Sequence, residues 1–333
     1  MKKVLFATTA LIASAGIASA QGVAVSGYAE MGIAGGDRYA VSDAQFWQDI
    51  DVTFTMSGET DNGLTFGASV DLDEAQDTCD LDGADDTINT ADDATSCGNA
   101  ALDDPFDDGG VAVFISGDFG RLTLGDTDGA LDRVMQDAVT AGGPGTIADD
   151  ESEHAGYLGA FSDGVFDGQI LAYEYSFGDF LFVVSHEQDV GGGDGTNAIG
   201  VRYSTSFGAA DITAGLGFLS ADDGGDNRDI VGLSVLAELD SGFSGVIGYS
   251  DWTGIGATDT DDNHTYIGLG YSIDAISVHV NYGEFDSGAS GYGFAAAYDL
   301  GGGASIHFGY GAGEASSTAA TIDSYSFGLA MSF

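Results

Sequence analysis

Residues 324–333 read Ser-Tyr-Ser-Phe-Gly-Leu-Ala-Met-Ser-Phe, and this segment decides the fold class. Every second residue from Tyr325 to Phe333 is large and apolar, whereas the residues between them are Ser, Gly and Ala. A period of two predicts a β-strand with one apolar face. The same alternation recurs at 64–72, 212–218, 276–282, 292–298 and 304–310. The chain from residue 22 onward is therefore predicted to be all-β.

The connections between the expected strands alternate between two lengths. Tight turns are expected near 59–63, 117–119, 177–179, 207–210, 240–242, 273–275 and 300–303. Longer polar loops are expected near 35–44, 75–109, 127–165, 187–197, 220–229, 252–264, 285–291 and 313–321. Seven turns and eight loops make fifteen connections and hence sixteen strands.

An even number of antiparallel strands, with short turns at one rim and long loops at the other, is typical of outer-membrane barrels. The alternative is a soluble β-sandwich, whose Greek-key crossings do not give strict alternation of connection lengths. We therefore predict, for residues 21–333, an all-β fold: a 16-stranded antiparallel transmembrane β-barrel with short periplasmic turns and long external loops. A barrel of this size encloses an aqueous channel.

Residues 1–20 have the pattern of a secretory signal peptide. Two lysines are followed by an apolar run and by Ala18-Ser19-Ala20, a small-residue cleavage site. The apolar run is shorter than the roughly 20 residues of a membrane-spanning helix. We expect cleavage after Ala20 and export of the mature chain.

The charge balance excludes one class of partner. The chain has 54 Asp and Glu against 7 Lys and Arg, a formal net charge of −47. Nucleic-acid binding requires Lys and Arg to neutralise phosphates, so a nucleic-acid partner is excluded. A content of 44% hydrophobic and 11% aromatic residues also argues against a disordered chain.

Two arginines are predicted to face the channel. Leu122 and Leu124 belong to the apolar face of their strand, which places Arg121 on the opposite face. Apolar residues alternate in the same way in 199–203, which places Arg202 on the inward face of its strand. The alternative for each is a position near a rim, solvated by bulk water. His279 and His307 also fall on polar strand faces and are expected to line the pore.

The second long loop, 75–109, is acidic and contains both cysteines. Its carboxylates Asp80, Asp82, Asp85 and Asp86 surround a glycine, an arrangement that suits Ca²⁺, although the bidentate Glu of an EF-hand is absent. Solvated loop acids are the alternative. Cys79 and Cys97 are expected to form one local disulfide in an exported protein.

The chain resembles the general diffusion porins of Gram-negative bacteria, most closely the trimeric alphaproteobacterial kind. The resemblance rests on the opening strand 22–30, on the long segment after the fifth strand and on the aromatic terminal strand that ends at Phe333. It implies a homotrimer in the outer membrane, in contact with its lipid. It also implies that the third loop, 127–165, folds into the barrel and constricts the pore.

This constriction is expected to carry charges of both signs. The third loop contributes acids and one arginine, and further arginines are expected to face them. The set is Asp128, Asp132, Asp137, Asp149, Asp150, Glu151 and Glu153, with Arg38, Arg121, Arg133 and Arg202. Opposed charges in a low-dielectric cleft create a transverse field. Since acids outnumber arginines, the pore is expected to prefer cations, whereas the alternative for each acid is an exposed loop charge.

The predicted function is passive diffusion of ions and small hydrophilic solutes through a water-filled channel, with no cofactor required. The alternative is a secreted acidic β-rich binding or structural protein. We find no constellation of nucleophile and base in the sequence, so we do not expect an enzyme.

Overall fold

The computed structural model describes residues 21–39, 43–73, 110–148, 151–159, 169–188, 195–222, 227–255 and 260–333. Several features predicted from the sequence lie outside these ranges. They are the signal peptide 1–20, the acidic loop with Asp80, Asp82, Asp85, Asp86, Cys79 and Cys97, and the loop acids Asp149 and Asp150.

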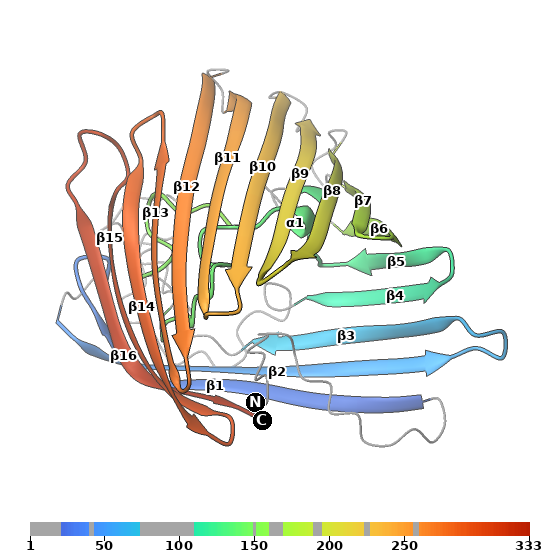
Figure 1. The fold of residues 1–333 in the computed structure, drawn as a ribbon, viewed down its shortest axis with the longest axis horizontal. Coiled ribbons are helices and arrows are strands. Elements are labelled where there is room, and N and C mark those ends of the chain that lie inside the picture. Colours follow the sequence, from blue (N-terminus) through green and yellow to red (C-terminus); the bar gives the residue numbers. More distant parts are fainter. Residues whose placement is uncertain are drawn as a thin grey trace, which may run out of the picture.

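Sixteen antiparallel strands form a closed barrel, in which β1 pairs with β16 and every other strand with its neighbours in sequence (Figure 1). The strands are β1 (Gln21–Gly35), β2 (Gln45–Glu59), β3 (Thr65–Asp73), β4 (Val111–Gly117), β5 (Gly120–Gly125), β6 (Ile170–Phe177), β7 (Phe180–Glu187), β8 (Gly195–Phe207), β9 (Ala210–Asp222), β10 (Asn227–Leu239), β11 (Phe243–Ile255), β12 (Thr260–Ile273), β13 (Ile276–Phe285), β14 (Ser290–Gly301), β15 (Ala304–Glu314) and β16 (Ile322–Ser332). The predicted fold class is confirmed.

The last residue of the chain meets the first strand where the barrel closes. The amide of Phe333 donates to the carbonyl of Gly27 at 2.8 Å, and the amide of Gly27 donates to the carbonyl of Phe333 at 3.3 Å. Figure 1 shows β16 beside β1. The aromatic strand from which the fold was predicted is thus the strand that closes it.

All the predicted tight turns are present, but several loops on the opposite rim are shorter than expected. The sequence predicted loops at 220–229 and 252–264, whereas β10 begins at Asn227 and β11 extends to Ile255. The polar residues in these segments, such as Asp229 and Asp261, are exposed strand residues. A strand that extends beyond the apolar band is solvated there and can carry acids on its outer face. Such a strand end has the polar sequence that is typical of a loop.

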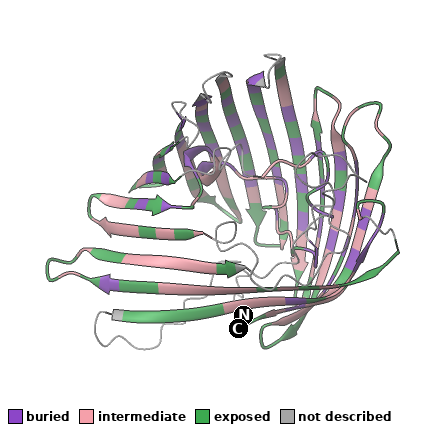
Figure 2. Cartoon of the chain, turned by 180° about the vertical axis from the view of Figure 1, so that it is seen from behind, coloured by how far each residue is buried: buried purple, intermediate pink, exposed green. Residues whose placement is uncertain are grey.

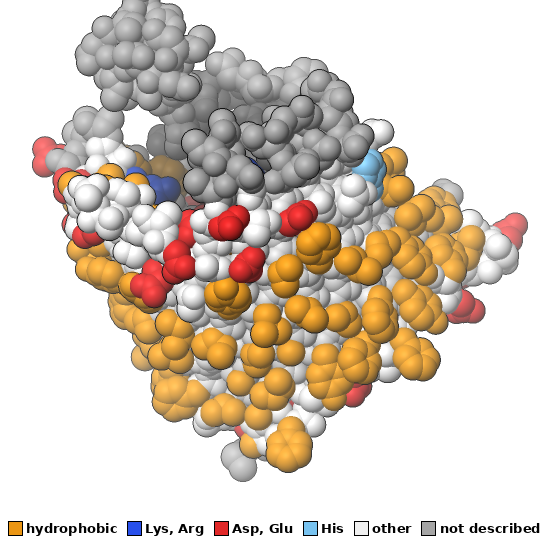
Figure 3. Space-filling model, turned by 90° about the horizontal axis from the view of Figure 1, so that it is seen from above, with side chains coloured by type: hydrophobic (Ala, Val, Ile, Leu, Met, Phe, Trp, Pro, Cys, Tyr) orange, Lys and Arg blue, Asp and Glu red, His pale blue; other side chains and the backbone are white. Residues whose placement is uncertain are grey.

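The outer face of the barrel carries a broad apolar band. Exposure alternates along each strand, as Figure 2 shows, so that in β13 Val280 and Tyr282 are exposed while His279 and Asn281 are buried. The face in Figure 3 is covered with hydrophobic side chains and is bordered by acids. An apolar band of this kind faces lipid in transmembrane barrels. Among the described residues, no helix is long and apolar enough to cross a membrane.

Candidate functional site

The described parts of the connection between β5 and β6, residues 126–148 and 151–159, lie inside the barrel, as the resemblance implied. It contains the short helix α1 (Ala130–Val134), which contacts the inner side of β7, β8 and β9 (Figure 1). Three residues of α1 are buried, namely Ala130, Leu131 and Val134. The amide of Ala130 donates to the hydroxyl of Ser185 on β7 at 2.8 Å, which ties the start of the helix to the wall.

An apolar core fills the space between this loop and the barrel wall. Leu131, Val134 and Met135 pack against inward side chains of β7 to β12. These wall residues are Val183, Ala198, Leu219, Ala221, Ile230, Leu236, Val246, Trp252 and Tyr266. Burial of apolar side chains stabilises such a contact by about 25 cal/mol per Å² removed from water. The third loop is therefore a packed part of the barrel interior.

Glycines on the inner face of the same wall let the loop approach the strands closely. The sequence Gly-x-Gly occurs on β9, β12, β14 and β15, at Gly215 and Gly217, Gly268 and Gly270, Gly291 and Gly293, and Gly309 and Gly311. We call these eight residues the glycine track. A Cβ atom at Gly268 would collide with the carbonyl of Ala138, and one at Gly215 with the carbonyl of Val134. The glycine track thus makes room for the loop backbone.

Three wall histidines bind carbonyl groups of the loop. His279 Nδ1 is 3.1 Å from the carbonyl of Ala141, and His307 Nδ1 is 3.1 Å from that of Gly145. His264 Nε2 is 2.9 Å from the carbonyl oxygen of Gly156. A carbonyl only accepts, so each of these ring nitrogens carries the proton. His279 and His307 were predicted to line the pore; this was wrong, because the loop buries both.

His154, on the loop itself, completes these contacts. Its Nε2 is 3.2 Å from Asn281 Oδ1, and its Nδ1 accepts a hydrogen bond from the amide of Gly156. Asn281 also donates from Nδ2 to the carbonyl of Ser152 at 2.8 Å. Burial lowers the pKa of His154 to about 4, with smaller contributions from His264 and Arg38. The imidazole is therefore neutral at physiological pH.

Two of the predicted pore acids have structural roles in the loop. Glu151 is completely buried (0% exposed), and its Oε2 accepts a hydrogen bond from Thr146 at 2.6 Å. The prediction that Glu151 lines the lumen was wrong, because its side chain lies between the loop and β15. Asp137 accepts hydrogen bonds from the amides of Val139 and Thr140 and from the hydroxyl of Tyr157. Its carboxylate therefore holds a turn of the loop.

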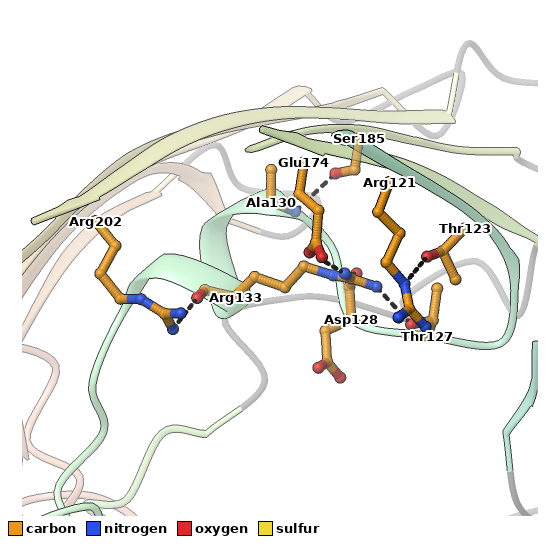
Figure 4. A network of polar contacts seen from close by, with 9 residues as sticks. All are labelled: Arg121, Thr123, Thr127, Asp128, Ala130, Arg133, Glu174, Ser185 and Arg202. Atoms are coloured by element: carbon orange, nitrogen blue, oxygen red, sulfur yellow. Dashed lines mark hydrogen bonds and ion pairs between the residues drawn. The ribbon is translucent and has the colours of Figure 1, made fainter. Parts of the chain in front are cut away.

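The other described acids of the loop lie away from its buried side. Asp128 is exposed, and Figure 4 shows its side chain pointing away from the strands. Asp132 lies on α1 but outside the buried set of that helix. Glu153 is exposed, and its carbonyl accepts a hydrogen bond of 3.3 Å from Arg38.

Arg133 connects the loop to the barrel wall. Its Nη1 is 2.9 Å from Glu174 Oε2 on β6. Its Nε donates to the carbonyl of Asp128 at 2.8 Å, and its Nη2 donates to the hydroxyl of Thr127 at 2.7 Å. The guanidinium is thus fixed by three contacts, and its charge is compensated by Glu174.

Arg121 and Arg202 lie on either side of Arg133 (Figure 4). Arg121 pairs in register with Glu174, donates from Nε to Thr123 at 3.3 Å, and lies 3.8 Å from the ring centre of Phe114. Arg202 donates from Nη1 to the carbonyl of Arg133 at 3.0 Å. Both side chains point into the barrel, the orientation that the alternation of apolar and polar residues along their strands indicated.

Sequence reasoning overlooked a row of acids on the opposite wall. On β2 the outward residues include Phe46 (92% exposed) and Ile50, so Asp49 and Asp51 face inward. Asp49 pairs in register with Glu30 on β1, and Thr53 with Asp71 on β3. The parity argument used for Arg121 would have found these acids. Within the described ranges, no group of three or more His, Cys, Asp or Glu residues is arranged to hold a metal ion.

Comparisons with known proteins decide the family. A family model described as Gram-negative porin matches residues 7–318. The chain belongs to this family. A porin of Rhodobacter capsulatus is 30% identical over 311 residues, which is 85% of this chain and 92% of that protein. The porin is therefore an outer-membrane protein that forms a channel for passive diffusion, and the secreted alternative is not favoured.

Solved structures support the same fold. A porin structure refined at 1.8 Å resolution superimposes with a TM-score of 0.66 at 23% identity, covering 94% of this chain and 100% of that chain. A triple mutant of the Rhodopseudomonas blastica porin gives a TM-score of 0.61 at 18% identity over the same shares. At these identities the likeness concerns the fold alone.

Proposed function

We propose that the porin prefers cations, because the inner face of β1 to β3 is acidic. The observation that carries this proposal is the inward row of Glu30, Asp49, Asp51 and Asp71 on β1, β2 and β3. These three strands contain no Lys or Arg. Fields from carboxylates at low-dielectric walls are focused into the water between them. Acidic rings favour cations over anions in the same way.

The arginines offset this field only in part. Arg133 is compensated by Glu174 at 2.9 Å, which leaves Arg121 and Arg202 as the main source of positive potential beside the loop. Asp128 and Asp132 lie on the same loop and carry the opposite sign. A dipolar solute between the arginines and the acids of β1 to β3 would be oriented by the transverse field, whereas an apolar solute would gain nothing from it.

A salt gradient tests the preference directly. The purified porin is inserted into a planar bilayer with tenfold different KCl concentrations on the two sides, and the reversal potential is measured. A sign that corresponds to K⁺ permeation supports the proposal. A sign that corresponds to Cl⁻ permeation refutes it, without affecting the assignment as a channel.

We also propose a homotrimer, in which the outer faces of β1 and its neighbours form the contact. The outward positions on β1 include the small residues Gly27 and Ala29, and Phe46 on β2 is 92% exposed. Such a surface packs against protein as well as against lipid. Light scattering of the porin in detergent tests the proposal: a monomer mass under conditions that preserve channel activity contradicts it.

The predictions outside the described residues remain proposals. N-terminal sequencing of the mature protein tests cleavage after Ala20, and detection of Met1 would refute it. Thermal unfolding with Ca²⁺ and with EDTA tests metal binding by Asp80, Asp82, Asp85 and Asp86. Mass spectrometry without reduction tests the disulfide between Cys79 and Cys97.

A further inference from the structure

A polar pocket of about 310 Å³ lies on the wall of the barrel where β4, β5 and β6 approach the short-turn rim. Its polar side chains include charges of both signs and hydroxyls, namely Ser116, Asp118, Arg121, Glu174 and Ser176. Ser116 and Glu174 are the register partners of Arg121 on β4 and β6, so these three side chains share the inner face. The volume falls within the range of roughly 300–1,000 Å³ that is usual for ligand sites.

Arg121 is held in a way that leaves one edge of its guanidinium available. Its Cζ lies 3.8 Å from the ring centre of Phe114, and its Nε donates to the hydroxyl of Thr123 at 3.3 Å (Figure 4). Phe114 and Thr123 are themselves register partners on β4 and β5. No described residue accepts a hydrogen bond from Nη1 or Nη2 of Arg121. Two parallel N–H donors on a fixed side chain match the two oxygens of a carboxylate.

The charges around this edge favour a ligand that carries both signs. Glu174 lies 2.9 Å from Arg133 Nη1 and beside Arg121, so two guanidinium groups share one carboxylate. A carboxylate on a solute would supply the second negative charge at Arg121. Asp118, exposed in the turn between β4 and β5, lines the same pocket and would attract an ammonium group. A simple anion would be repelled by Asp118, and a simple cation by Arg121.

We propose that this pocket binds small zwitterions of the α-amino acid type, with the carboxylate on Nη1 and Nη2 of Arg121 and the ammonium toward Asp118. The hydroxyls of Ser116 and Ser176 can each donate and accept a further hydrogen bond there. The channel gives solutes access to the pocket, so the site selects among the solutes that the porin admits. Its occupant is neutral overall, and the proposal therefore goes beyond the cation preference and does not depend on it.

Saturation-transfer NMR of the porin in detergent tests the site with three matched solutes. L-Alanine carries both charges, L-lactate has a hydroxyl in place of the ammonium, and L-alaninamide has an amide in place of the carboxylate. We expect L-alanine to bind about fivefold more tightly than L-lactate, as for one exposed ion pair. It should bind about tenfold more tightly than L-alaninamide, which loses the charge-assisted hydrogen bonds. Equal binding of all three solutes, or tighter binding of L-lactate or L-alaninamide than of L-alanine, would overturn the proposal.

Two variants and one control assign the two charges to their residues. Arg121→Lys keeps the positive charge but loses the paired donors, and it should weaken binding of L-alanine about tenfold. Asp118→Asn should bind L-lactate at least as tightly as the wild type and lose the preference for L-alanine. Arg228→Lys makes the same exchange on β10, outside the pocket, and should bind as the wild type.

Circular dichroism shows that each variant retains its β-sheet. Wild-type binding of L-alanine by Arg121→Lys, or an unchanged preference in Asp118→Asn, would refute the site. The reversal potential in a KCl gradient is a separate measurement, so failure of this proposal is distinguishable from failure of the proposed cation preference.

Discussion

The guanidinium of Arg133, on the loop inside the barrel, lies 2.9 Å from the carboxylate of Glu174 on β6. Glu174 also pairs in register with Arg121 on β5, so that one carboxylate lies beside two arginines of the channel. The ion pair both ties the loop to the wall and removes one positive charge from the field in the lumen.

Neutralising Glu174 should shift selectivity toward anions. In Glu174→Gln, Arg133 and Arg121 lose their shared counter-charge. A unit charge about 4 Å from a passing ion changes its energy by about 1 kcal/mol in water, with opposite signs for K⁺ and Cl⁻, so the ratio of K⁺ to Cl⁻ permeability should fall by up to about 30-fold. The reversal potential in a KCl gradient measures this ratio.

Asp61→Asn is the matched control for that experiment. It makes the same change of charge in the exposed turn between β2 and β3, outside the lumen. Selectivity should stay at the wild-type value. An equal shift in both variants would show that net charge, and not the position of Glu174, determines selectivity.

Neutralising the acids of β2 should weaken the cation preference. Asp49→Asn combined with Asp51→Asn removes two inward carboxylates while retaining their shape. Since the two sites lie in the same row on one wall, we expect a larger drop in K⁺ selectivity than from any single loop acid. Asp128→Asn is the comparison on the loop side. A double variant with unchanged reversal potential would contradict the role of this wall.

Filling the glycine track should displace the loop. In Gly268→Val, the new side chain collides with the carbonyl of Ala138, and such overpacking costs about 1–3 kcal/mol. We expect larger single-channel conductance and more current noise than in the wild type. Gly22→Val is the control, because a Cβ at Gly22 meets nothing within 4 Å. Wild-type conductance in Gly268→Val would mean that the barrel wall moves to accommodate the new side chain while the loop stays in place, and this would contradict the prediction.

The attachment of the loop should weaken in mild acid. The pKa of His154 is lowered from 6.5 to about 4, so the folded state binds fewer protons than the unfolded state between these values. Neutral His154 makes its full contribution to the stability of the docked loop above pH 6.5. This contribution to the free energy is lost as the pH falls toward 4, a difference of about 3 kcal/mol. Hydrogen exchange at Gly156 should therefore be faster at pH 5 than at pH 7.5, after correction for the intrinsic rate.

Variants assign this effect to one histidine. His154→Gln should exchange quickly at Gly156 and show a smaller change with pH. His186→Gln, at an exposed outward position on β7, should keep the wild-type profile. If His154→Gln kept the full pH dependence, the effect would belong to His264, His279 or His307, which also bind the loop.

The barrel could be predicted from the sequence because each strand carries its own evidence. Tyr325, Phe327 and Leu329 mark an apolar face by local alternation, and no distant contact is needed to interpret them. The apolar residues on either side of Arg121 and Arg202 likewise predict that these two side chains point inward. These inferences depend only on the two-residue repeat of an extended chain.

The docking of the loop could not be predicted in the same way, because it depends on contacts between distant segments. His279 was expected in water since its strand face is polar, yet the carbonyl of Ala141 covers it. Glu151 was expected in the lumen and is buried. A signal was nevertheless present: Phe218-Leu219 and Val246-Ile247 break the alternation, and the inward member of each pair belongs to the core beneath the loop.

The glycine track and the core beneath the loop divide the barrel into two functional halves. Strands that hold the loop have little freedom to vary, because many of their inward side chains pack against it. Among the described residues, the inner faces of β1, β2 and β3 contribute no side chain to that core and carry Glu30, Asp49, Asp51 and Asp71 instead. A designer who wishes to turn this porin into a sensor for a chosen analyte should therefore introduce new recognition groups on β1, β2 and β3, and leave β8 to β15 untouched.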